Sequence, residues 1–254
     1  MSDVLLAASA VTRRFGGLMA VNGVSLQLQR GQVHAVIGTN GAGKSTLINI
    51  LSGELAPSSG QVMLGGRDIT AWRQPDRARA GLGRSYQRST IFPELSVFEN
   101  CRLAAQARRQ RFWHWWRPAT ECRHSAELAR HALERTGLAD DAAREAGLLP
   151  HGRKRQLEIA MCLAGEPQVL LLDEPLAGMG PEETDRILEL LNALKPGHAI
   201  LLVEHDMDAV FRVAETITVM VNGAAIASGT PAAIRANPDV RTAYLGEDSH
   251  GASV

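Results

Sequence analysis

One glycine-rich segment carries the residue types that bind a phosphate chain. It follows a predicted strand at 33–37, precedes a predicted helix that runs to residue 51, and consists of Gly38, Thr39, Asn40, Gly41, Ala42, Gly43, Lys44, Ser45 and Thr46. Glycines let backbone N–H groups converge on phosphate, and the helix adds the positive end of its dipole. Lys44 would neutralise the β- and γ-phosphates, and the Ser45 hydroxyl would bind Mg²⁺. Because a chance glycine turn does not require this order of strand, loop and helix, the segment predicts binding of a nucleoside triphosphate.

Two aliphatic strands end in ionisable residues, where an α/β sheet places its ligand crevice. Residues 169–172 precede Asp173 and Glu174, and a second predicted strand, 200–203, lies just ahead of His205. Asp173 suits the Mg²⁺ shell, whereas Glu174 is placed to polarise an attacking water, which favours hydrolysis over transfer to a small acceptor. His205 would bond the γ-phosphate and orient that water. The alternatives are that the two acids only cap the next helix and that His205 is an ordinary loop residue.

The elements that must position these residues alternate between strands and helices. Predicted strands and hairpins occupy residues 4–11, 24–28, 33–37, 61–67, 169–172, 199–203 and 217–221. Predicted helices occupy residues 43–51, 96–111, 121–136, 181–194 and 207–213. The early strands are separated by glycine turns and indicate antiparallel pairing, whereas unbroken aliphatic strands between helices indicate a parallel sheet that is covered on both faces. The middle third is a helical lobe set into this α/β domain.

Composition and charge exclude several classes of protein. The 27 lysines and arginines balance 27 acidic residues, so no bulk field favours nucleic acid or an anionic membrane. Locally, eleven arginines stand against four acidic residues within 73–123, which predicts a basic lobe. The odd set Cys101, Cys122 and Cys162 fits neither a disulfide framework nor a zinc site and indicates a reducing compartment. The apolar run 4–11 is too short for a membrane helix and lacks the basic leader of a signal peptide.

Several motifs occur in one order and together resemble an ATP-binding-cassette (ABC) ATPase. They are GTNGAGKST, the isolated Gln87, LPHGRKRQLEIA, LLLDEP and VEHD, and the match runs from Val4 to Gly246. FGGLMAVNGVSL, LEIAMCLA, EHDMDAVF and the tail GTPAAIRANPDVRTAYLGE further resemble the cassette subunit of branched-chain amino-acid importers. The resemblance implies an α/β P-loop NTPase fold with a RecA-like parallel-sheet core, an N-terminal antiparallel β subdomain and an inserted α-helical subdomain. It divides the single domain 1–254 into a core, 1–86 and 166–254, and a helical subdomain, 87–165.

The resemblance also implies roles for single residues. Phe15 stands where such cassettes stack an aromatic ring on adenine, and the alternative is a buried core Phe. Gln87 matches the glutamine that contacts Mg²⁺ and the attacking water and moves with the transmembrane partner, whereas a lone loop Gln would otherwise be solvated. The implied metal ligands are Ser45, Gln87 and Asp173, and the implied catalytic residues are Glu174, His205 and Gln87.

One segment departs from the family pattern. The signature that binds the γ-phosphate held by the opposite subunit is replaced by Leu149, Pro150, His151, Gly152 and Arg153. Gly152 still offers a backbone N–H at a helix start, but Pro150 replaces the serine hydroxyl and removes an amide donor. Arg153 would supply positive charge instead. Gly180, where an acid would couple the two sites, is a second departure, and we expect an asymmetric dimer with a different cassette.

The resemblance implies ATP and Mg²⁺ as cofactors and an assembly of several subunits. A second ABC ATPase subunit, in a homodimer or heterodimer, would meet this one head to tail around two ATP molecules. Two transmembrane permease subunits would dock beside residues 85–100, chiefly on 88–93, with a substrate-binding protein acting indirectly and no nucleic acid involved. The chain would lie on the cytoplasmic face of the inner (cell) membrane, peripherally through the permeases. The cluster from Trp113 to Trp116 would either contact headgroups or membrane subunits or fold into the helical lobe.

Other functions stay open at this point. Within transport, urea, amides or aromatic acids are related cargoes, because specificity lies in subunits outside this chain. A soluble ABC ATPase of DNA repair or translation is a second class, disfavoured because the sequence shows no coiled-coil arms, zinc modules or second cassette. A third is a non-hydrolytic cassette, which Pro150 favours and Glu174 disfavours.

Overall fold

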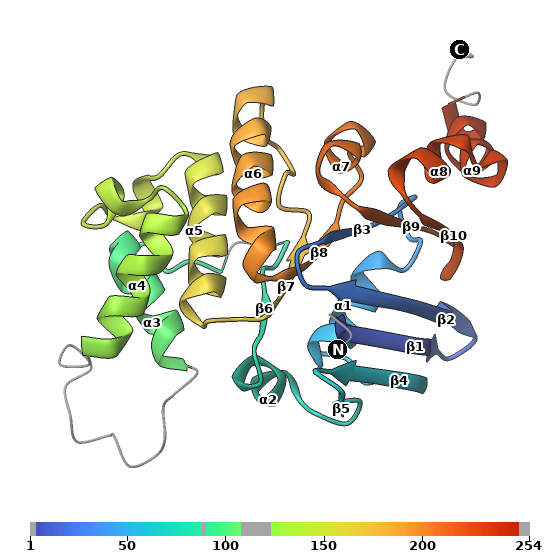
Figure 1. Ribbon diagram of the computed structural model, residues 1–254, viewed down its shortest axis with the longest axis horizontal. Helices are drawn as coiled ribbons and strands as arrows, with labels where there is room; N and C mark the ends of the chain where they lie inside the picture. The colour runs from blue at the N-terminus through green and yellow to red at the C-terminus, as the bar shows by residue number, and fades with distance from the viewer. Residues whose placement is uncertain (1–3, 88–89, 108–122, 249–254) are drawn as a thin grey trace.

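The computed structural model describes residues 4–87, 90–107 and 123–248, which form two β-sheets and the helices that cover them (Figure 1). The strands are β1 (Val4–Phe15), β2 (Leu18–Gln29), β3 (Val33–Gly38), β4 (Ser59–Leu64), β5 (Arg67–Asp68), β6 (Leu82–Arg84), β7 (Val169–Asp173), β8 (Ala199–Val203), β9 (Thr216–Val221) and β10 (Ala224–Gly229). The α-helices are α1 (Lys44–Ser52), α2 (Gln74–Arg79), α3 (Val97–Ala107), α4 (Arg123–Arg135), α5 (His151–Ala164), α6 (Pro181–Leu194), α7 (Met207–Val213), α8 (Pro231–Ala236) and α9 (Pro238–Asp248). Each predicted strand, hairpin or helix is present as far as it falls within the described residues.

The smaller sheet is antiparallel and has the strand order β2-β1-β4-β5. β1 turns into β2 at Gly16, whose φ of 57° is a left-handed conformation that glycine adopts without strain. Leu6, Val11 and Leu28 of this sheet are fully buried and share one core cluster with Leu47 of α1. The smaller sheet therefore packs on α1.

The larger sheet carries the phosphate-binding segment near its centre. Its order is β10-β9-β3-β8-β7-β6, and all neighbours are parallel except β9 with β10. Alternate residues of a strand point to opposite faces, so Ala35 and Ile37 join the cluster with α6 and α7, whereas Val36 joins α1 and the smaller sheet. The sheet is thus covered on both faces, as the unbroken aliphatic strands predict. The carboxyl ends of β3, β8 and β7 lie side by side.

Helices α3, α4 and α5 pack on one another and form a helical lobe at the left of Figure 1. Cys101, Leu133 and Leu157, one from each helix, are buried in the same cluster as one face of the larger sheet. α5 also contacts β6. The lobe is therefore joined to the sheet chiefly through α5.

The prediction of a basic lobe within 73–123 is wrong for several of its described arginines. Arg77 is fully buried and donates two hydrogen bonds of 2.8 Å to carbonyl oxygens at the end of α1. The side chains of Arg84 and Arg102 are 6% and 8% exposed and are paired with acidic residues. These charges stabilise the fold, because a buried guanidinium needs carbonyl or carboxylate acceptors.

Candidate active site

The phosphate-binding segment forms a tight loop between β3 and α1. Gly43 caps α1 with a φ of 98°, and a Cβ at this position would lie 2.2 Å from the carbonyl oxygen of Ala20. A Cβ on Gly38 would lie 2.3 Å from the carbonyl oxygen of Met220. Glycine is therefore required at both positions, because a side chain would push the loop away from the neighbouring strands.

Lys44 begins α1, and its ammonium group is held inside the loop. The Nζ atom donates to the carbonyl oxygens of Gly38 at 2.6 Å and Thr39 at 3.0 Å. Burial lowers the pKa of Lys44, while the carboxylates of Glu174 and Asp173 act to raise it. A phosphate chain that enters the loop would offer this ammonium stronger acceptors than the two carbonyls.

A cavity of about 700 Å³ opens over this loop. Its volume lies in the range of small-molecule sites, about 300–1,000 Å³. The wall brings together the phosphate loop, the ring of Phe15, and the side chains of Gln87 and Glu174. Ser45 and Thr46 lie on the same wall, so most of the residues predicted to bind nucleotide meet in one place.

Two parts of this wall are not predicted by the sequence pattern. β2 contributes Met19 and Ala20, and the turn between β9 and β10 contributes Asn222 and Gly223. The turn has φ values of 47° and 81°, and its Gly223 N–H donates to the carbonyl oxygen of Ala42 at 3.0 Å. Asn-Gly between two strands is a hairpin signal, but only the strand order of the larger sheet brings this turn to the loop.

The ring of Phe15 is 46% exposed, so the alternative that it belongs to the core is wrong. The guanidinium carbon of Arg13 lies 4.8 Å from the centre of this ring. Arg13 is held in turn by a hydrogen bond of 2.9 Å to the carbonyl oxygen of Ala56. A fixed cation therefore covers part of the ring, and the ring borders the cavity. Stacking of Phe15 on adenine stays a prediction.

Gln87 and Glu174 meet at the cavity although they come from distant parts of the chain. The Nε2 atom of Gln87 donates to Oε2 of Glu174 at 2.7 Å. Glu174 has a φ of 48°, and its N–H donates to the carbonyl oxygen of Val203 at 2.9 Å. This conformation is uncommon for a residue with a side chain, and the end of β8 holds it here. Gln87 is exposed in a bend and its side chain is bound to the carboxylate, so its contact with Mg²⁺ and the attacking water stays a prediction.

Asp173 ends β7 and is 5% exposed. Its Oδ2 lies 3.7 Å from Nη2 of Arg84. Burial raises the pKa of Asp173, while the Arg84 guanidinium acts to lower it. α6 is capped by Gly180 without a side-chain bond, so the alternative that Asp173 and Glu174 cap this helix is wrong.

The end of β8 contributes a second acidic group beside Glu174. Glu204 is fully buried, and its carboxylate accepts from the N–H of Leu176 at 2.8 Å and from the N–H of His205 at 3.2 Å. Burial raises the pKa of Glu204 to about 7, while these two N–H groups act to lower it. The side chain of His205 is 60% exposed, and its Nδ1 lies 3.7 Å from Glu204. Glu204, for which the sequence pattern predicts no role, thus fixes the loop that follows Glu174.

The five residues in the signature position lie at the start of α5. Pro150 is the N-cap residue, Leu149 is buried and His151 is exposed. The N–H of Gly152 donates to Oε1 of Glu183 at 3.2 Å, and a Cβ on Gly152 would lie 2.5 Å from the same oxygen. The prediction that this N–H is free for a phosphate needs correction, because a carboxylate of the same chain already fills that place.

Arg153 is also engaged within its own chain. Its Nη2 lies 2.8 Å from Oδ2 of Asp141, and its Nη1 donates to the carbonyl oxygen of Gly137 at 2.9 Å. The prediction that Arg153 supplies charge to a phosphate therefore requires the Asp141 pair to open. The described residues that line the cavity over the phosphate loop include none of Leu149 to Arg153.

Comparison with known proteins shows the family to which this chain belongs. Residues 21–177 match a family model described as ABC transporter, and this span includes the phosphate loop, Gln87 and Glu174. The chain belongs to the ABC transporter family. Residues 226–250 of the cassette match a second model, described as branched-chain amino acid ATP-binding cassette transporter.

Curated relatives are similar to the cassette over nearly its whole length. The high-affinity branched-chain amino acid transport ATP-binding protein BraF of Pseudomonas aeruginosa is 43% identical over 255 residues, which cover 97% of this chain and 100% of that protein. The corresponding proteins named LivG of Salmonella typhimurium and Escherichia coli are 42% and 41% identical over 254 residues, with the same coverage.

Solved structures confirm the fold of the cassette. The ADP conformation of an ATP-binding cassette of an ABC transporter matches with a TM-score of 0.86 and 31% identity, over 96% of this chain and 99% of that chain. A nucleotide-free ATP-binding cassette from an ABC transporter matches with a TM-score of 0.85 and 30% identity, over 95% and 98% of the two chains. The predicted α/β cassette fold is therefore correct.

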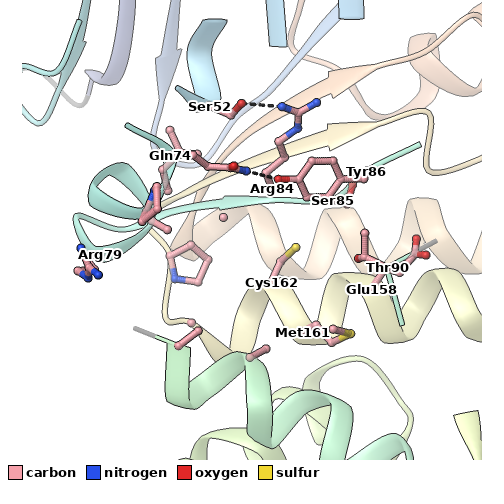
Figure 2. A pocket seen from close by; sticks show the side chains of 18 residues that line it. Ser52, Gln74, Arg79, Arg84, Ser85, Tyr86, Thr90, Glu158, Met161 and Cys162 are labelled. Atoms are coloured by element: carbon pink, nitrogen blue, oxygen red, sulfur yellow. Dashed lines mark hydrogen bonds between the residues drawn. The ribbon is translucent and has the colours of Figure 1, made fainter. Parts of the chain in front are cut away.

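A second cavity of the cassette, of about 320 Å³, lies between the larger sheet and the helical lobe (Figure 2). Arg84 and Tyr86 border it at the end of β6, whereas Met161 and Cys162 border it from α5. Thr90, within the stretch predicted to receive a membrane subunit, also lies on its wall. This cavity is the hollowed part of the surface in that predicted docking region.

Some predictions fall partly outside the described residues of the cassette. The cluster from Trp113 to Trp116 and two residues of the docking stretch, Arg88 and Ser89, lie there. In the described part of that stretch, Phe92 is 50% exposed, whereas Phe98 packs against the core of the lobe. No helix within the described ranges combines the length and the apolar character of a membrane span.

Proposed function

We propose that this chain is the ATP-hydrolysing subunit of an importer of branched-chain or related amino acids. The observation that carries the proposal is the hydrogen bond of 2.7 Å between Gln87 and Glu174, on the wall of a cavity that the phosphate loop also lines. A carboxylate held beside the place of the terminal phosphate suits the activation of water. The names of the relatives and the match of residues 226–250 support the class of cargo.

The residues of the cavity divide the work of hydrolysis. Phe15 stacks on the base, and Lys44 exchanges its bonds to two loop carbonyls for bonds to phosphate oxygens. Glu174 orients the attacking water, and Gln87 approaches the γ-phosphate from the cavity wall. His205 does not line the cavity, and its exposed side chain would reach the γ-phosphate from the loop after β8. Because these groups are held by backbone and side-chain bonds before nucleotide arrives, little reorganisation is needed in the transition state.

The oxygen donors on this wall and at the buried end of β7 fit Mg²⁺. Because Gln87 gives its Nε2 to Glu174, its carbonyl Oε1 is the atom left for a cation. Together with the Ser45 hydroxyl and the Asp173 carboxylate, it forms the small set of hard ligands that Mg²⁺ takes from proteins when phosphates supply the rest. The ion supplies positive charge to the β- and γ-phosphates.

The segment from Leu149 to Arg153 serves a second cassette in this proposal. Two cassettes, identical or different, meet head to tail around two ATP molecules, and each offers its signature segment to the other. Two permease subunits, each docked at the cavity of Figure 2 in one of the two cassettes, hold the pair on the cytoplasmic face of the membrane. A substrate-binding protein acts through them. The core, 1–86 and 166–254, and the helical subdomain, 87–165, are the bodies that move.

ATP hydrolysis by the purified chain, alone and with its membrane subunits in proteoliposomes, tests the proposal. Glu174→Gln should lower kcat by about 100-fold or more, because a general base contributes that much to rate. Glu189→Gln, an exposed acid of α6, is the matched control and should leave kcat unchanged. Turnover that does not depend on Glu174 would contradict the hydrolytic role. Stimulation by urea or aromatic acids and not by leucine would contradict the cargo.

A further inference from the structure

A buried arginine–glutamate pair on α5 lies between the cavity of Figure 2 and Gln87. Arg155 and Glu158 are 9% and 4% exposed, and Nη1 of Arg155 lies 2.8 Å from Oε2 of Glu158. Residues three apart share one face of a helix, so both side chains leave α5 in the same direction. Because both side chains are buried, each charge needs the other as its partner.

The same guanidinium holds the segment that carries Gln87. Nη1 of Arg155 donates to the carbonyl oxygen of Tyr86 at 3.2 Å, and Nη2 donates to the carbonyl oxygen of Gln87 at 3.0 Å. A planar fork that bonds two successive carbonyls fixes their place relative to α5. Since the side chain of Gln87 donates to Glu174 at 2.7 Å, the place of α5 determines how Gln87 meets the catalytic carboxylate.

Glu158 has one oxygen that the fold does not use. Its Oε1 is buried and has no hydrogen-bond partner among the described residues, and Glu158 lines the cavity of Figure 2 beside Met161 and Cys162. A buried carboxylate oxygen without a donor is unfavourable until one reaches it. Nε of Arg155 is likewise buried without a partner among the described residues, so the pair is not fully satisfied within the fold. An N–H group, cationic or amide, that enters the cavity and shifts the Glu158 side chain would find an acceptor in this oxygen.

We propose that Arg155 and Glu158 are positioning residues that couple the cavity to hydrolysis at Glu174. An N–H donor on the permease segment that fills the cavity binds Oε1 of Glu158, and the shift of this carboxylate moves the guanidinium that holds Gln87. The inference rests on the proposed function for the identity of the partner. The contacts of Arg155 with the Gln87 segment are independent of that identity.

Hydrogen exchange in the nucleotide-free, full-length protein tests the positioning without any turnover. Arg155→Gln removes the fork, so peptides that contain residues 85–87 should exchange about fivefold faster or more, with β3 unchanged. Arg155→Lys keeps a positive charge, but its single, shorter-reaching ammonium cannot replace the two nitrogens that hold Glu158 and both carbonyls at once. It should give the same change if Arg155→Gln fails to fold. Unchanged exchange in folded Arg155→Lys would overturn the proposal.

Arg77→Lys is the matched control for these exchange measurements. Arg77 is also buried and also donates to backbone carbonyls, but at the end of α1. It should lower the melting temperature without faster exchange at residues 85–87. Faster exchange there in Arg77→Lys as well would show a general loss of stability and contradict a specific role of Arg155.

A double-mutant cycle tests whether Arg155 acts through Gln87. Arg155→Lys should lower kcat about tenfold with KM for ATP within about twofold, because an interaction that serves the transition state is lost. In the Gln87→Ala background the same change should lower kcat by less than about twofold. Both substitutions act on the same interaction, the contact of Gln87 with Glu174, which can be lost only once. Fully additive effects would contradict the coupling. If wild-type hydrolysis does not depend on Glu174, the proposed function fails, whereas the exchange result still decides the positioning.

Glu158→Gln tests the side of the pair that faces the cavity. The amide keeps the shape and one acceptor for Arg155 but removes the charge that receives the partner's N–H. The ratio of ATPase activity with and without the membrane subunits should fall about fivefold, as expected when a buried charged hydrogen bond is lost at an interface. An unchanged ratio would overturn the coupling to the cavity.

Discussion

Of the side chains assigned to hydrolysis, Glu174 is held by its neighbours, whereas the side chain of His205 is 60% exposed. Glu174 accepts from Gln87 at 2.7 Å, and its left-handed backbone is fixed by a hydrogen bond to Val203. Two residues later, Leu176 is bound by the buried carboxylate of Glu204. A group that is already oriented needs little reorganisation when the reaction begins. Substitutions of these neighbours should therefore change the rate of hydrolysis, and at Glu204 also the dependence of stability on pH.

Phe15→Ala should weaken ATP binding about 5- to 100-fold, because stacking of a base on an aromatic ring contributes about 1–3 kcal/mol. Phe15→Tyr keeps the ring and should stay within about twofold of the wild type. Calorimetric titration with ATP measures both, and inorganic triphosphate is the control ligand because it has no base. An equal loss of affinity for inorganic triphosphate would show that Phe15 supports the loop and not the base.

Glu204→Gln should make the stability of the protein less dependent on pH. Burial raises the pKa of Glu204 to about 7, whereas an unfolded glutamate titrates near about 4.3. The raised folded pKa means that stability is lost as pH rises from about 4.3 through about 7, by roughly 4 kcal/mol above that range. Thermal melts should show the variant gaining about 5 °C or more on the wild type between about pH 5 and pH 8. A constant difference between the two proteins would contradict a raised pKa at Glu204.

At the scale of elements, the nucleotide site is a junction of segments from both sheets. β3 and α1 supply the phosphate loop, β2 closes on it at Ala20, and the β9–β10 turn bonds it through Gly223. β7 and β8 supply Glu174 and Glu204 at the neighbouring strand ends. The loop has a fixed shape because the backbone of β2 and of the β9–β10 turn packs against it. Even one added methyl group in the loop should therefore lower the affinity for nucleotide.

Gly43→Ala should abolish high-affinity nucleotide binding. The added Cβ would meet the Ala20 carbonyl oxygen at 2.2 Å in a backbone with a φ of 98°, so the loop must move. Strain and overpacking of this kind predict an affinity loss of about 30-fold or more for ATP. Gly197→Ala is the control, because a Cβ there meets no described atom within 4 Å and the backbone is not left-handed. Wild-type affinity in Gly43→Ala would show that the loop is not held as described.

At the scale of the whole molecule, the cassette carries its nucleotide cavity and the segment in the signature position on different parts of its fold. Its own cavity lies over the phosphate loop, whereas the signature segment opens α5 in the helical lobe. The Gly152 N–H at that segment is occupied by Glu183 of α6, where a partner's γ-phosphate would bind. In the proposed dimer, assembly around ATP requires that this internal bond open, because Glu183 competes with the incoming phosphate for one donor.

Glu183→Ala should lower the ATP concentration needed for dimerisation. Removing the competing carboxylate frees the Gly152 N–H, and a charged hydrogen bond of this kind corresponds to about tenfold in apparent affinity. Light scattering of Glu174→Gln protein with ATP measures the change from a 27.3 kDa monomer to the dimer. Glu182→Ala, at the exposed neighbouring position, is the control. A higher ATP requirement in Glu183→Ala would mean that Glu183 holds the segment in its binding shape.

Much of the candidate site follows from short stretches of sequence. The phosphate loop, the acids after β7 and the histidine after β8 each lie within one strand and the loop that follows it. Their geometry is set by bonds between near neighbours, which a local pattern reports. The aliphatic runs also determine that the sheet is parallel and covered on both faces, because such strands cannot face water.

Contacts between distant segments were decided only by the tertiary structure. β6 has only three residues and includes Arg84, so a search for apolar runs does not predict it as a strand. In the structure it pairs with β7 in the larger sheet. Two further bonds join segments far apart in the chain: the Gly152 N–H donates to the Glu183 carboxylate, and the Arg155 guanidinium donates to the Gln87 carbonyl oxygen. A single sequence determines which residues prefer to be buried or to bind phosphate, but not which side chains meet. That choice is made when burial of both sheet faces brings distant polar groups together and each must find a partner.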